Sequence, residues 1–329
     1  MMLRSCFRKS CWMLPSVLVF LFFLSAHAQT PQSFPDKPIK IIVANPPGGP
    51  VDVVLRVLAN RMSAIWHQPV VVENKPGGSG IVSTSALVKA APDGYTIAMV
   101  TASSMTIMPF AVESLPYDPI KDLQPISLVA RTPFIFIVRQ DSPIKTWQDF
   151  VSLAKIKDLT IGSYAIGSAF QLVWEQTARR VGIQAVYAPA NSAGKTQSDL
   201  VGGQLDIVLE APSSANAMLD SGRVRAIAIT SPERFAGLPD TPTLAESGLK
   251  GYASLPWIGL MGPAGMPAER VRIIQQTVAE ILKEPDMQKQ LQILGMMPVG
   301  SDPQILADTI VQERRDMQPL VKELGIKLQ

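Results

Sequence analysis

The chain has 329 residues, with 30 basic and 27 acidic side chains, and 47% of its residues are hydrophobic. This length is enough for two α/β domains, and the apolar fraction is typical of compact globular packing rather than of disorder. With only two histidines and two cysteines, the sequence offers little material for a histidine–zinc site, a Cys–His pair or a Ser–His–Asp triad.

The first 28 residues have the pattern of a secretory signal peptide. Three basic residues lie within 4–9, an apolar run (VLVFLFFL) covers 17–24, and Ala-His-Ala at 26–28 is a small-x-small cleavage pattern. A transmembrane anchor is the alternative, but the apolar run is shorter than the roughly 20 residues that span a bilayer. We therefore expect cleavage after Ala28 and a periplasmic protein, with no cysteine near the cleavage point to carry a lipid.

Removing this segment changes the charge and the available chemistry. The remaining chain has equal numbers of acidic and basic residues, and a neutral chain without a basic run is a poor candidate for binding nucleic acid. Cys6, Cys11 and His27 all lie in the segment, which leaves His67 alone, in a predicted surface turn. We expect no disulfide, no metal site, no cofactor and no nucleic-acid partner.

The mature chain begins with alternating strands and helices. Strands are predicted at 39–43 (IKIIV), 70–72 and 95–100 (YTIAMV). Between them, one helix begins at Pro50 with apolar residues at helical spacing, and another covers 81–89. This order predicts a parallel sheet with right-handed crossovers.

A second α/β unit of similar size follows, and the C-terminal part is helical. The second unit has predicted strands at 134–138, 159–161, 207–209 and 226–230, and predicted helices at 147–154, 169–181 and 194–201. The C-terminal helices begin at Pro267, Pro285 and Pro303, and the middle one ends at Gly295.

Three strand-to-helix junctions are rich in glycine and small hydroxyl side chains. They are 45–50 (NPPGGP), 101–104 (TASS) and 162–168 (GSYAIGS). Ligands of parallel α/β sheets collect at such junctions, close to helix N-termini. Gly48 and Gly49 are expected to let the backbone approach an anion and to turn N–H groups toward it. Each loop alone is ordinary turn chemistry, so the prediction of an anion site depends on all three.

Five segments follow one another in the order FPDKPIKIIVANPPGGPVDVVLR, QPVVVENKPGGSG, APDGYTIAM, LPYDPIKDLQPISLVAR and GLMGPAGMP. In this order and spacing they resemble the substrate-binding proteins of tripartite tricarboxylate transporters, also called Bug receptors. The resemblance implies an α/β fold of the type II periplasmic binding protein class, with two doubly wound α/β lobes around a ligand cleft. By this analogy lobe one contains 29–130 and 256–329, and lobe two contains 131–255.

The resemblance also implies a function. Such a receptor binds a small carboxylate through backbone N–H groups and small hydroxyls, without chemistry, and passes it to membrane components of a tripartite tricarboxylate-type transporter. We expect it to act as a monomer. The predicted ligand-binding residues are Asn45, Pro46, Gly48, Gly49, Thr101, Ser103 and Ser104 from lobe one, and Gly162, Ser163, Tyr164, Gly167, Ser168, Asn191 and Glu210 from lobe two.

The sequence departs from the family pattern around the predicted ligand. Asn45 stands where an aromatic residue is usual, Gln171 where histidine is common, and Glu210 where aspartate is usual. Tyr164 and Ile166 replace small or polar residues, and these larger side chains favour an aromatic or branched acid less polar than citrate.

Several alternatives stay open at this point. Tyr164, Phe170 and Trp174 could pack in the core, and Glu210 could cap the turn at 213–214 instead of facing a ligand. A periplasmic enzyme that acts on small acids would need a second titratable group beside Glu210. A receptor that presents its ligand to a signalling kinase would have the same sequence features as a transport receptor.

Overall fold

Two β-sheets organise the part of the chain that the computed structural model describes, residues 34–164, 168–190 and 192–327. The predicted signal peptide, with its cleavage point, lies outside these residues, as do Gly167 and Asn191. Residues 34–329 form one compact unit.

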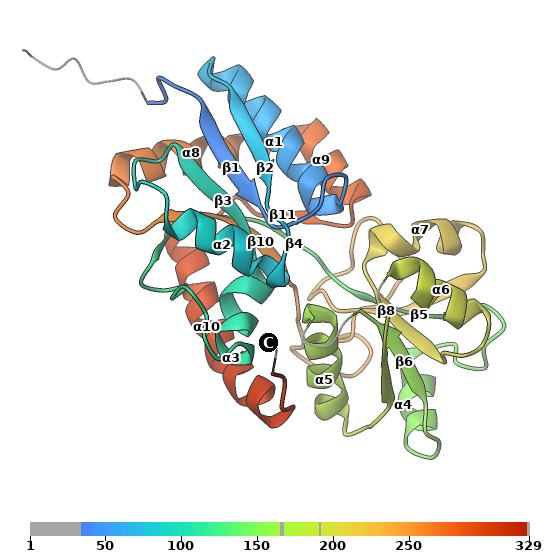
Figure 1. The fold of residues 1–329 in the computed structure, drawn as a ribbon. Helices are drawn as coiled ribbons and strands as arrows, with labels where there is room; N and C mark the ends of the chain where they lie inside the picture. The colour runs from blue at the N-terminus through green and yellow to red at the C-terminus, as the bar shows by residue number, and fades with distance from the viewer. Residues whose placement is uncertain (1–33, 165–167, 191, 328–329) are drawn as a thin grey trace, which may run out of the picture. The chain divides into compact units, whose positions relative to one another are not determined.

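The first sheet has the strand order β11-β4-β10-β3-β1-β2 (Figure 1). Its strands are β1 (Ile39–Val43), β2 (Val70–Asn74), β3 (Thr96–Thr101), β4 (Leu123–Arg131), β10 (Trp257–Pro263) and β11 (Met297–Pro298). The predicted parallel pairing of β1 with β2 and β3 is confirmed. In addition, β10 runs antiparallel between β3 and β4, and β11 pairs antiparallel with β4.

Helices cover both faces of this sheet. They are α1 (Pro50–Trp66), η1 (Gly78–Gly80), α2 (Ile81–Val88), the π-helix η2 (Ser103–Ile107), α3 (Met108–Ala111), α8 (Ala268–Ile281), α9 (Pro285–Ile293) and α10 (Pro303–Glu323). Successive residues of β1 point to opposite faces of the sheet. Ile41 packs with Leu55 of α1 and Ile274 of α8 on one face. Ile42 packs with Leu87 of α2 and Leu306 of α10 on the other. Burial on both faces explains why these strands are nearly all apolar.

The second sheet has the order β7-β6-β8-β5-β9. Its strands are β5 (Ile135–Arg139), β6 (Thr160–Ser163), β7 (Val186–Pro189), β8 (Ile207–Glu210) and β9 (Val224–Ile229), and its helices are α4 (Trp147–Ala154), α5 (Ala169–Val181), α6 (Ala193–Val201) and α7 (Pro212–Asp220). Strand β6 is parallel to β7 and β8, while β5 is antiparallel to β8 and β9. The aromatic residues Phe136, Phe150 and Trp174 form the centre of one core, so Trp174 is a packing residue.

Two chain segments connect the sheets, and they are hydrogen-bonded to each other. The chain leaves the first sheet after β4 and returns at β10. The Thr132 N–H donates to Pro256 O at 2.7 Å, the Thr230 N–H to Phe134 O at 2.9 Å, and the Ser254 N–H to Thr230 O at 3.0 Å. These three bonds fasten the outgoing and returning segments side by side.

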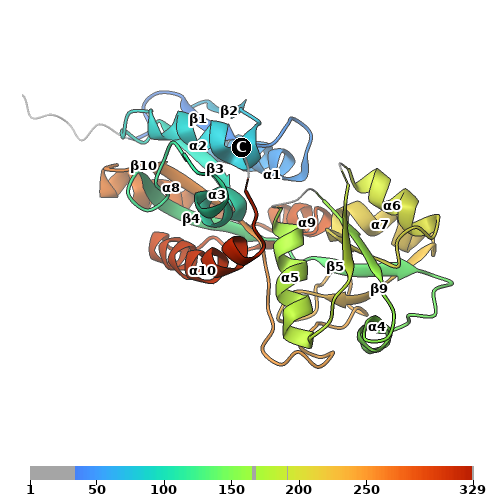
Figure 2. The ribbon, with the colours of Figure 1, turned by 60° about the horizontal axis from the view of Figure 1, so that its bottom comes forward.

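Helix α5 of the second sheet approaches the first-sheet elements, and α10 lies alongside β4 (Figure 2). Helix α7 also approaches them, since a Cβ on Gly295 would lie 3.1 Å from Ser213 N. Leu172 of α5 belongs to the same apolar cluster as Ile107, Leu320 and Val321. Near the surface, the Arg179 guanidinium forms an ion pair with Glu323 at 2.6 Å. The two sheets are therefore in contact through α5 and α10.

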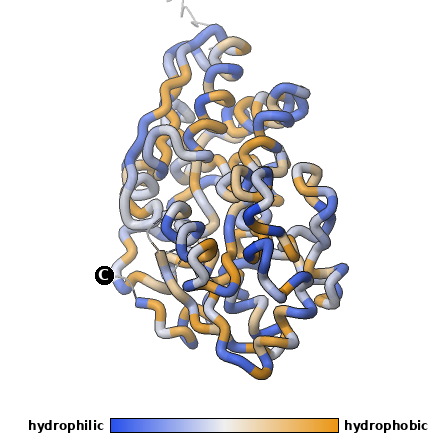
Figure 3. The backbone as a smooth tube through the Cα atoms, turned by 90° about the vertical axis from the view of Figure 1, so that its right-hand side faces the viewer, coloured by the Kyte–Doolittle hydropathy of each residue, from blue (hydrophilic) through white to orange (hydrophobic). Residues whose placement is uncertain are grey.

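Hydrophobic stretches alternate with hydrophilic ones along the chain (Figure 3). Within the ranges given above, none of the helices is long and apolar enough to cross a membrane.

Candidate functional site

The first predicted junction, 45–50, is organised by its own hydrogen bonds. Gly48 has a φ of +85°, and its N–H donates to Asp52 Oδ2 at 2.9 Å. Gly49 has a φ of −71°, and its N–H donates to Pro46 O at 3.4 Å. The expectation that both glycines turn free N–H groups toward an anion is therefore corrected, because both groups are bonded within the loop.

Asp52 holds this junction together, and sequence reasoning missed it. Its side chain is 1% exposed and also accepts hydrogen bonds from Arg56 Nε at 2.8 Å and Asn74 Nδ2 at 2.7 Å. Asn74 Nδ2 donates in addition to Asn45 O at 2.8 Å. Burial raises the pKa of Asp52, but the bonds from Arg56, Asn74 and Gly48 outweigh burial and leave this pKa lowered. The sequence signal that could have identified Asp52 was its position as an acidic residue in the first turn of a helix.

The first two junctions lie side by side. A Cβ placed on Gly80 would be 2.9 Å from the Cβ of Ser104 and 3.7 Å from that of Ala44. The Ser104 hydroxyl donates to Thr101 O at 2.9 Å, and Ser104 is 2% exposed, so this hydroxyl supports the loop. Thr101 and Ser103 keep partly exposed surface beside it. What was expected as a loop is the end of β3 followed directly by the π-helix η2.

In the third junction, as in the second, some small residues hold the backbone in place and do not face open space. The buried Ser163 hydroxyl donates to Leu209 O at 2.9 Å, and a Cβ on Gly162 would lie 2.3 Å from Leu205 Cδ1. Both residues therefore hold β6 against its neighbours. Ser168 caps α5, because its Oγ accepts from the Gln171 N–H at 3.3 Å.

Tyr164 and Glu210 form a hydrogen-bonded pair. The Tyr164 hydroxyl donates to Glu210 Oε1 at 2.6 Å, and the Ala211 N–H donates to the same oxygen at 3.1 Å. Glu210 is fully buried, and burial raises its pKa although the donors partly offset this. The carboxyl group thus lies behind Tyr164 and is bonded to the backbone just before α7, which has no side-chain cap.

The ring of Tyr164 belongs to an aromatic row. Its centroid lies 4.5 Å from that of Phe170, and Phe170 stacks on Phe134 at 3.8 Å. Tyr164 is partly buried, so part of its surface is open. The row extends from the third junction to the segment that connects the sheets.

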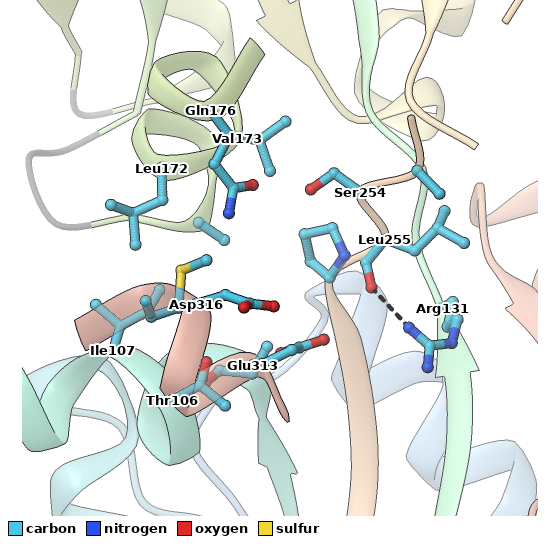
Figure 4. A pocket seen from close by; sticks show the side chains of 15 residues that line it. Thr106, Ile107, Arg131, Leu172, Val173, Gln176, Ser254, Leu255, Glu313 and Asp316 are labelled. Atoms are coloured by element: carbon cyan, nitrogen blue, oxygen red, sulfur yellow. Dashed lines mark hydrogen bonds between the residues drawn. The ribbon is translucent and has the colours of Figure 1, made fainter. Parts of the chain in front are cut away.

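A pocket lies next to the second and third junctions, between elements of the two sheets (Figure 4). It begins at Ala102 of the second junction and at Ala169, the first residue of α5. It is lined further by Thr106, Ile107, Arg131, Leu172, Val173, Gln176, Ala253, Ser254, Leu255, Pro256, Glu313, Asp316 and Met317. The predicted ligand residues that the structure describes are not among the residues lining it, and Ala102 is the one residue of the described parts of the three junctions that forms part of its wall.

Three charged residues line the pocket, Arg131, Glu313 and Asp316, and sequence reasoning missed Glu313 as well. Glu313 Oε2 accepts a hydrogen bond from Trp257 Nε1 at 2.8 Å. Burial raises the pKa of Glu313 to about 7, and the Trp257 bond and the charge of Arg131 only partly offset this. In the sequence Glu313 stands in a polar stretch of a helix, which is typical of a solvated face.

The arrangement favours binding over bond-breaking chemistry. The accessible groups at the junctions are neutral hydroxyls, peptide groups and one aromatic ring, while the carboxyl groups of Asp52 and Glu210 are enclosed. Among the residues with described positions, no cluster of three or more His, Cys, Asp or Glu side chains could hold a metal ion.

The sequence is similar to one family model and to proteins from other bacteria. Residues 54–326 match the family model for the tripartite tricarboxylate transporter family receptor. A Pseudomonas sp. (strain P51) protein from the tcbD–tcbE intergenic region is 31% identical, over 91% of this chain and 90% of that protein. BugT of Bordetella pertussis is 29% identical, over 94% of this chain and 97% of BugT.

Solved structures are similar over the same span. An R. palustris protein solved with adipate is 27% identical, with a TM-score of 0.77 over 89% of this chain and 99% of that one. MatC from Rhodopseudomonas palustris, with bound malate, is 28% identical, with a TM-score of 0.72 over 88% of this chain and 100% of MatC. The two-sheet α/β arrangement described above is thus shared with these proteins.

Proposed function

The chain belongs to the tripartite tricarboxylate transporter receptor family, and from this premise we propose that it is a periplasmic receptor that captures a small carboxylate for a tripartite tricarboxylate-type transporter. The match over 54–326 carries the proposal. The ligands named for two similar structures, adipate and malate, are small carboxylates, and this supports the same ligand class here.

In this proposal the ligand lies in a cleft between two lobes. Lobe one comprises 29–130 and 256–329, and lobe two comprises 131–255. The distribution of the strands supports this division, because β1 to β4, β10 and β11 share one sheet and β5 to β9 the other. A ligand that contacts both lobes stabilises their closed arrangement, which the membrane components would recognise.

We assign different roles to the proposed ligand-binding residues. Thr101 and Ser103 supply accessible groups to the carboxylate, and Gly48 and Gly49 leave space for its approach. Tyr164 provides an apolar wall from lobe two. The supporting residues are Asn45, Pro46, Ser104, Gly162, Ser163, Ser168 and Glu210, and Gly167 and Asn191 remain predictions from the sequence.

The aromatic row of Tyr164, Phe170 and Phe134 supports an acid with one carboxylate toward lobe one and an apolar body toward lobe two. A highly charged tricarboxylate would be poorly compensated at such a wall, because the junctions offer neutral donors.

A thermal-shift panel of adipate, malate, citrate, benzoate and nicotinate tests this function. A bound ligand stabilises the protein by about 2.7 kcal/mol at a hundredfold excess over its Kd. We expect acids with an apolar body to raise the melting temperature more than citrate does. A shift with citrate alone would contradict the apolar-body assignment, and no shift with any acid would contradict the receptor.

Two further measurements separate this function from its alternatives. After incubation the ligand should be recovered unchanged, whereas an enzyme would convert it. Deletion of the gene should abolish uptake of the acid; an intact uptake with a lost transcriptional response would indicate a signalling receptor.

Export can be tested independently. N-terminal analysis of protein from the periplasmic fraction should give Gln29, the residue after the proposed cleavage point. An intact Met1 on membrane-bound protein would contradict this assignment.

A further inference from the structure

Tyr164 follows directly after β6 and is held at three points. Its hydroxyl donates to Glu210 Oε1 at 2.6 Å, and its carbonyl oxygen accepts from the Tyr187 hydroxyl at 2.6 Å. Its ring packs on Phe170, with 4.5 Å between the centroids. These contacts of the hydroxyl, the carbonyl and the ring fix the direction in which the side chain points.

The proton of the Tyr164 hydroxyl lies toward Glu210. Glu210 Oε1 also accepts from the Ala211 N–H at 3.1 Å, so this oxygen is an acceptor and the phenol is the donor of the shorter bond. Burial raises the pKa of Tyr164, and the charge of Glu210 and the bond to it raise this pKa further, although the Ser214 hydroxyl lowers it. The phenol consequently keeps its proton at neutral pH.

A tyrosine hydroxyl has one proton to donate. Because Glu210 accepts this proton, Tyr164 can offer a ligand only its ring and an oxygen lone pair, and the Ser214 hydroxyl competes for that lone pair. A carboxylate accepts hydrogen bonds and donates none, so it would find no partner at Tyr164.

We propose that Glu210 is a positioning residue, which makes the lobe-two side of the ligand site reject a second carboxylate because it accepts the one proton of Tyr164. This rests on the proposed function, in which Tyr164 faces the ligand from lobe two. Glu210 is fully buried, so it acts through Tyr164 and not by contact with the ligand. The ligand class is then a monocarboxylate whose far end is apolar or carries a hydrogen-bond donor.

The surroundings of Glu210 determine how it can be varied. Thr196 Oγ1 lies 3.5 Å from Glu210 Oε2 and donates a closer bond, at 2.8 Å, to Ala193 O. In Glu210→Gln, the amide oxygen can still accept from Tyr164 and Ala211 while the amide nitrogen turns toward Thr196. Glu210→Gln therefore keeps the acceptor and removes only the ionisable group, whereas Glu210→Leu removes both.

Two acids with the same number of carbons, hexanoate and adipate, test the assignment by calorimetric titration. They differ at one end, where hexanoate has a methyl group and adipate a second carboxylate; benzoate and terephthalate give the same comparison for an aromatic ligand. We expect the parent to bind the monocarboxylate about tenfold more tightly, or more, because the second carboxylate would be buried without a donor. In Glu210→Leu the freed Tyr164 hydroxyl can donate to that carboxylate, so the preference should fall about tenfold.

Three further variants separate the engaged proton from the charge of Glu210 and from a loss of stability. Glu210→Gln should restore the preference of the parent; a preference as low as in Glu210→Leu would show that the charge of Glu210 repels the dicarboxylate, and would overturn the proposal. Tyr164→Phe combined with Glu210→Leu has no hydroxyl to free, so it should also show the parent's preference. Tyr252→Phe breaks another buried hydroxyl bond, to Thr177 at 2.6 Å, and should lower stability without changing the preference.

The outcomes distinguish this proposal from the proposed function. A parent that prefers the dicarboxylate, or equal preferences in the parent and Glu210→Leu, would overturn the role of Glu210 and leave the receptor function intact. If no acid binds, the receptor function fails and the ligand class with it, and the hydroxyl proton still decides on the placement of the donor. We expect a slowly exchanging proton NMR signal that is absent from Tyr164→Phe and lost in Glu210→Leu; no such signal in the parent would contradict the engaged proton.

Discussion

Gly48 and Gly49 are adjacent in the sequence, but the structure gives them different requirements. Gly48 has a φ of +85° and open space around a hypothetical Cβ, whereas Gly49 has a φ of −71° and would place its Cβ 3.5 Å from Pro46 O. Only Gly48 therefore needs the conformational freedom of glycine. We propose that Gly49 is needed because a side chain there would occupy the space of the ligand.

Substitutions should separate these two requirements. Gly48→Ala should lower the free energy of unfolding by about 1 kcal/mol, because alanine is strained at this φ. Gly49→Val should leave a cooperative melt but abolish binding of the acid identified in the thermal-shift panel. Urea unfolding and calorimetric binding measure the two effects. Normal affinity in Gly49→Val would place the ligand away from this loop.

Glu210 should make stability fall as the pH rises. Burial raises its pKa, so the native state favours the neutral form and loses stability above about pH 4.5, where the unfolded chain ionises. Glu210→Gln should remove this contribution, and its stability relative to the parent should increase from pH 4 to pH 8. Urea unfolding across this range, in a Glu313→Gln background, isolates the effect. A constant difference would show that Glu210 does not titrate in this range.

At the scale of elements, helices with a capping residue and an apolar face could be predicted with correct limits. Helix α4 begins after Thr146, whose side chain accepts from the Asp149 N–H, and α5 begins after Ser168. Strand β10 and the π-helix η2 were not predicted. All residues of β10 are buried and show no alternation, and a π-helix has no periodic sequence pattern of its own.

The positions of the three junctions at strand ends were predictable, but their hydrogen bonds were not. The sequence places small residues at the correct strand ends, and Gly80 brings two of these junctions together. Whether Ser104 or Ser163 donates to a ligand or to a backbone carbonyl depends on contacts across the sheet. Glu313 was missed for the same reason, since its partner Trp257 comes from another element, and Asp52 was missed although Gly48 and Arg56 are near it in the sequence.

The hydrogen bonds of Asp52 should make the loop 45–50 contribute to both ligand affinity and stability. Asp52→Asn should lower the ligand affinity about tenfold and the stability by about 2 kcal/mol at pH 7, because three donors lose an ionised acceptor. The lowered pKa of Asp52 means that its contribution is present at neutral pH and is lost as the pH falls. The difference between variant and parent should therefore shrink toward acid pH in urea unfolding.

Arg56→Met provides the control for this loop. It removes one donor from Asp52 and leaves the bonds from Gly48 and Asn74. We expect a smaller loss of affinity than for Asp52→Asn. Equal losses in the two variants would show that the ion pair, and not the loop geometry, is required.

At the scale of the whole molecule, one apolar contact connects the sheets through α5. Leu172→Ala removes side-chain atoms packed against Ile107, Leu320 and Val321, at a cost of about 2–4 kcal/mol if the contact is maintained. If loss of this contact lets the two sheets separate, part of the cost should appear as a larger radius of gyration in X-ray scattering. Leu159→Ala, buried in the second-sheet core, should destabilise without this expansion. The same radius in both variants would contradict the role of Leu172.

The position of β10 between β3 and β4 has a consequence for biosynthesis. This strand begins at Trp257, so the ribosome completes the entire second sheet, residues 135–229, before the centre of the first sheet exists. Until then, β3 has one unpaired edge and β4 has two, since β11 is made later still, and such edges are open to pairing with other chains. The second sheet can form from a nascent chain in one stretch, whereas the first must wait for a strand made much later. Aggregation during synthesis should therefore begin from β3 and β4, and it should decrease once β10, which ends at Pro263, has been made.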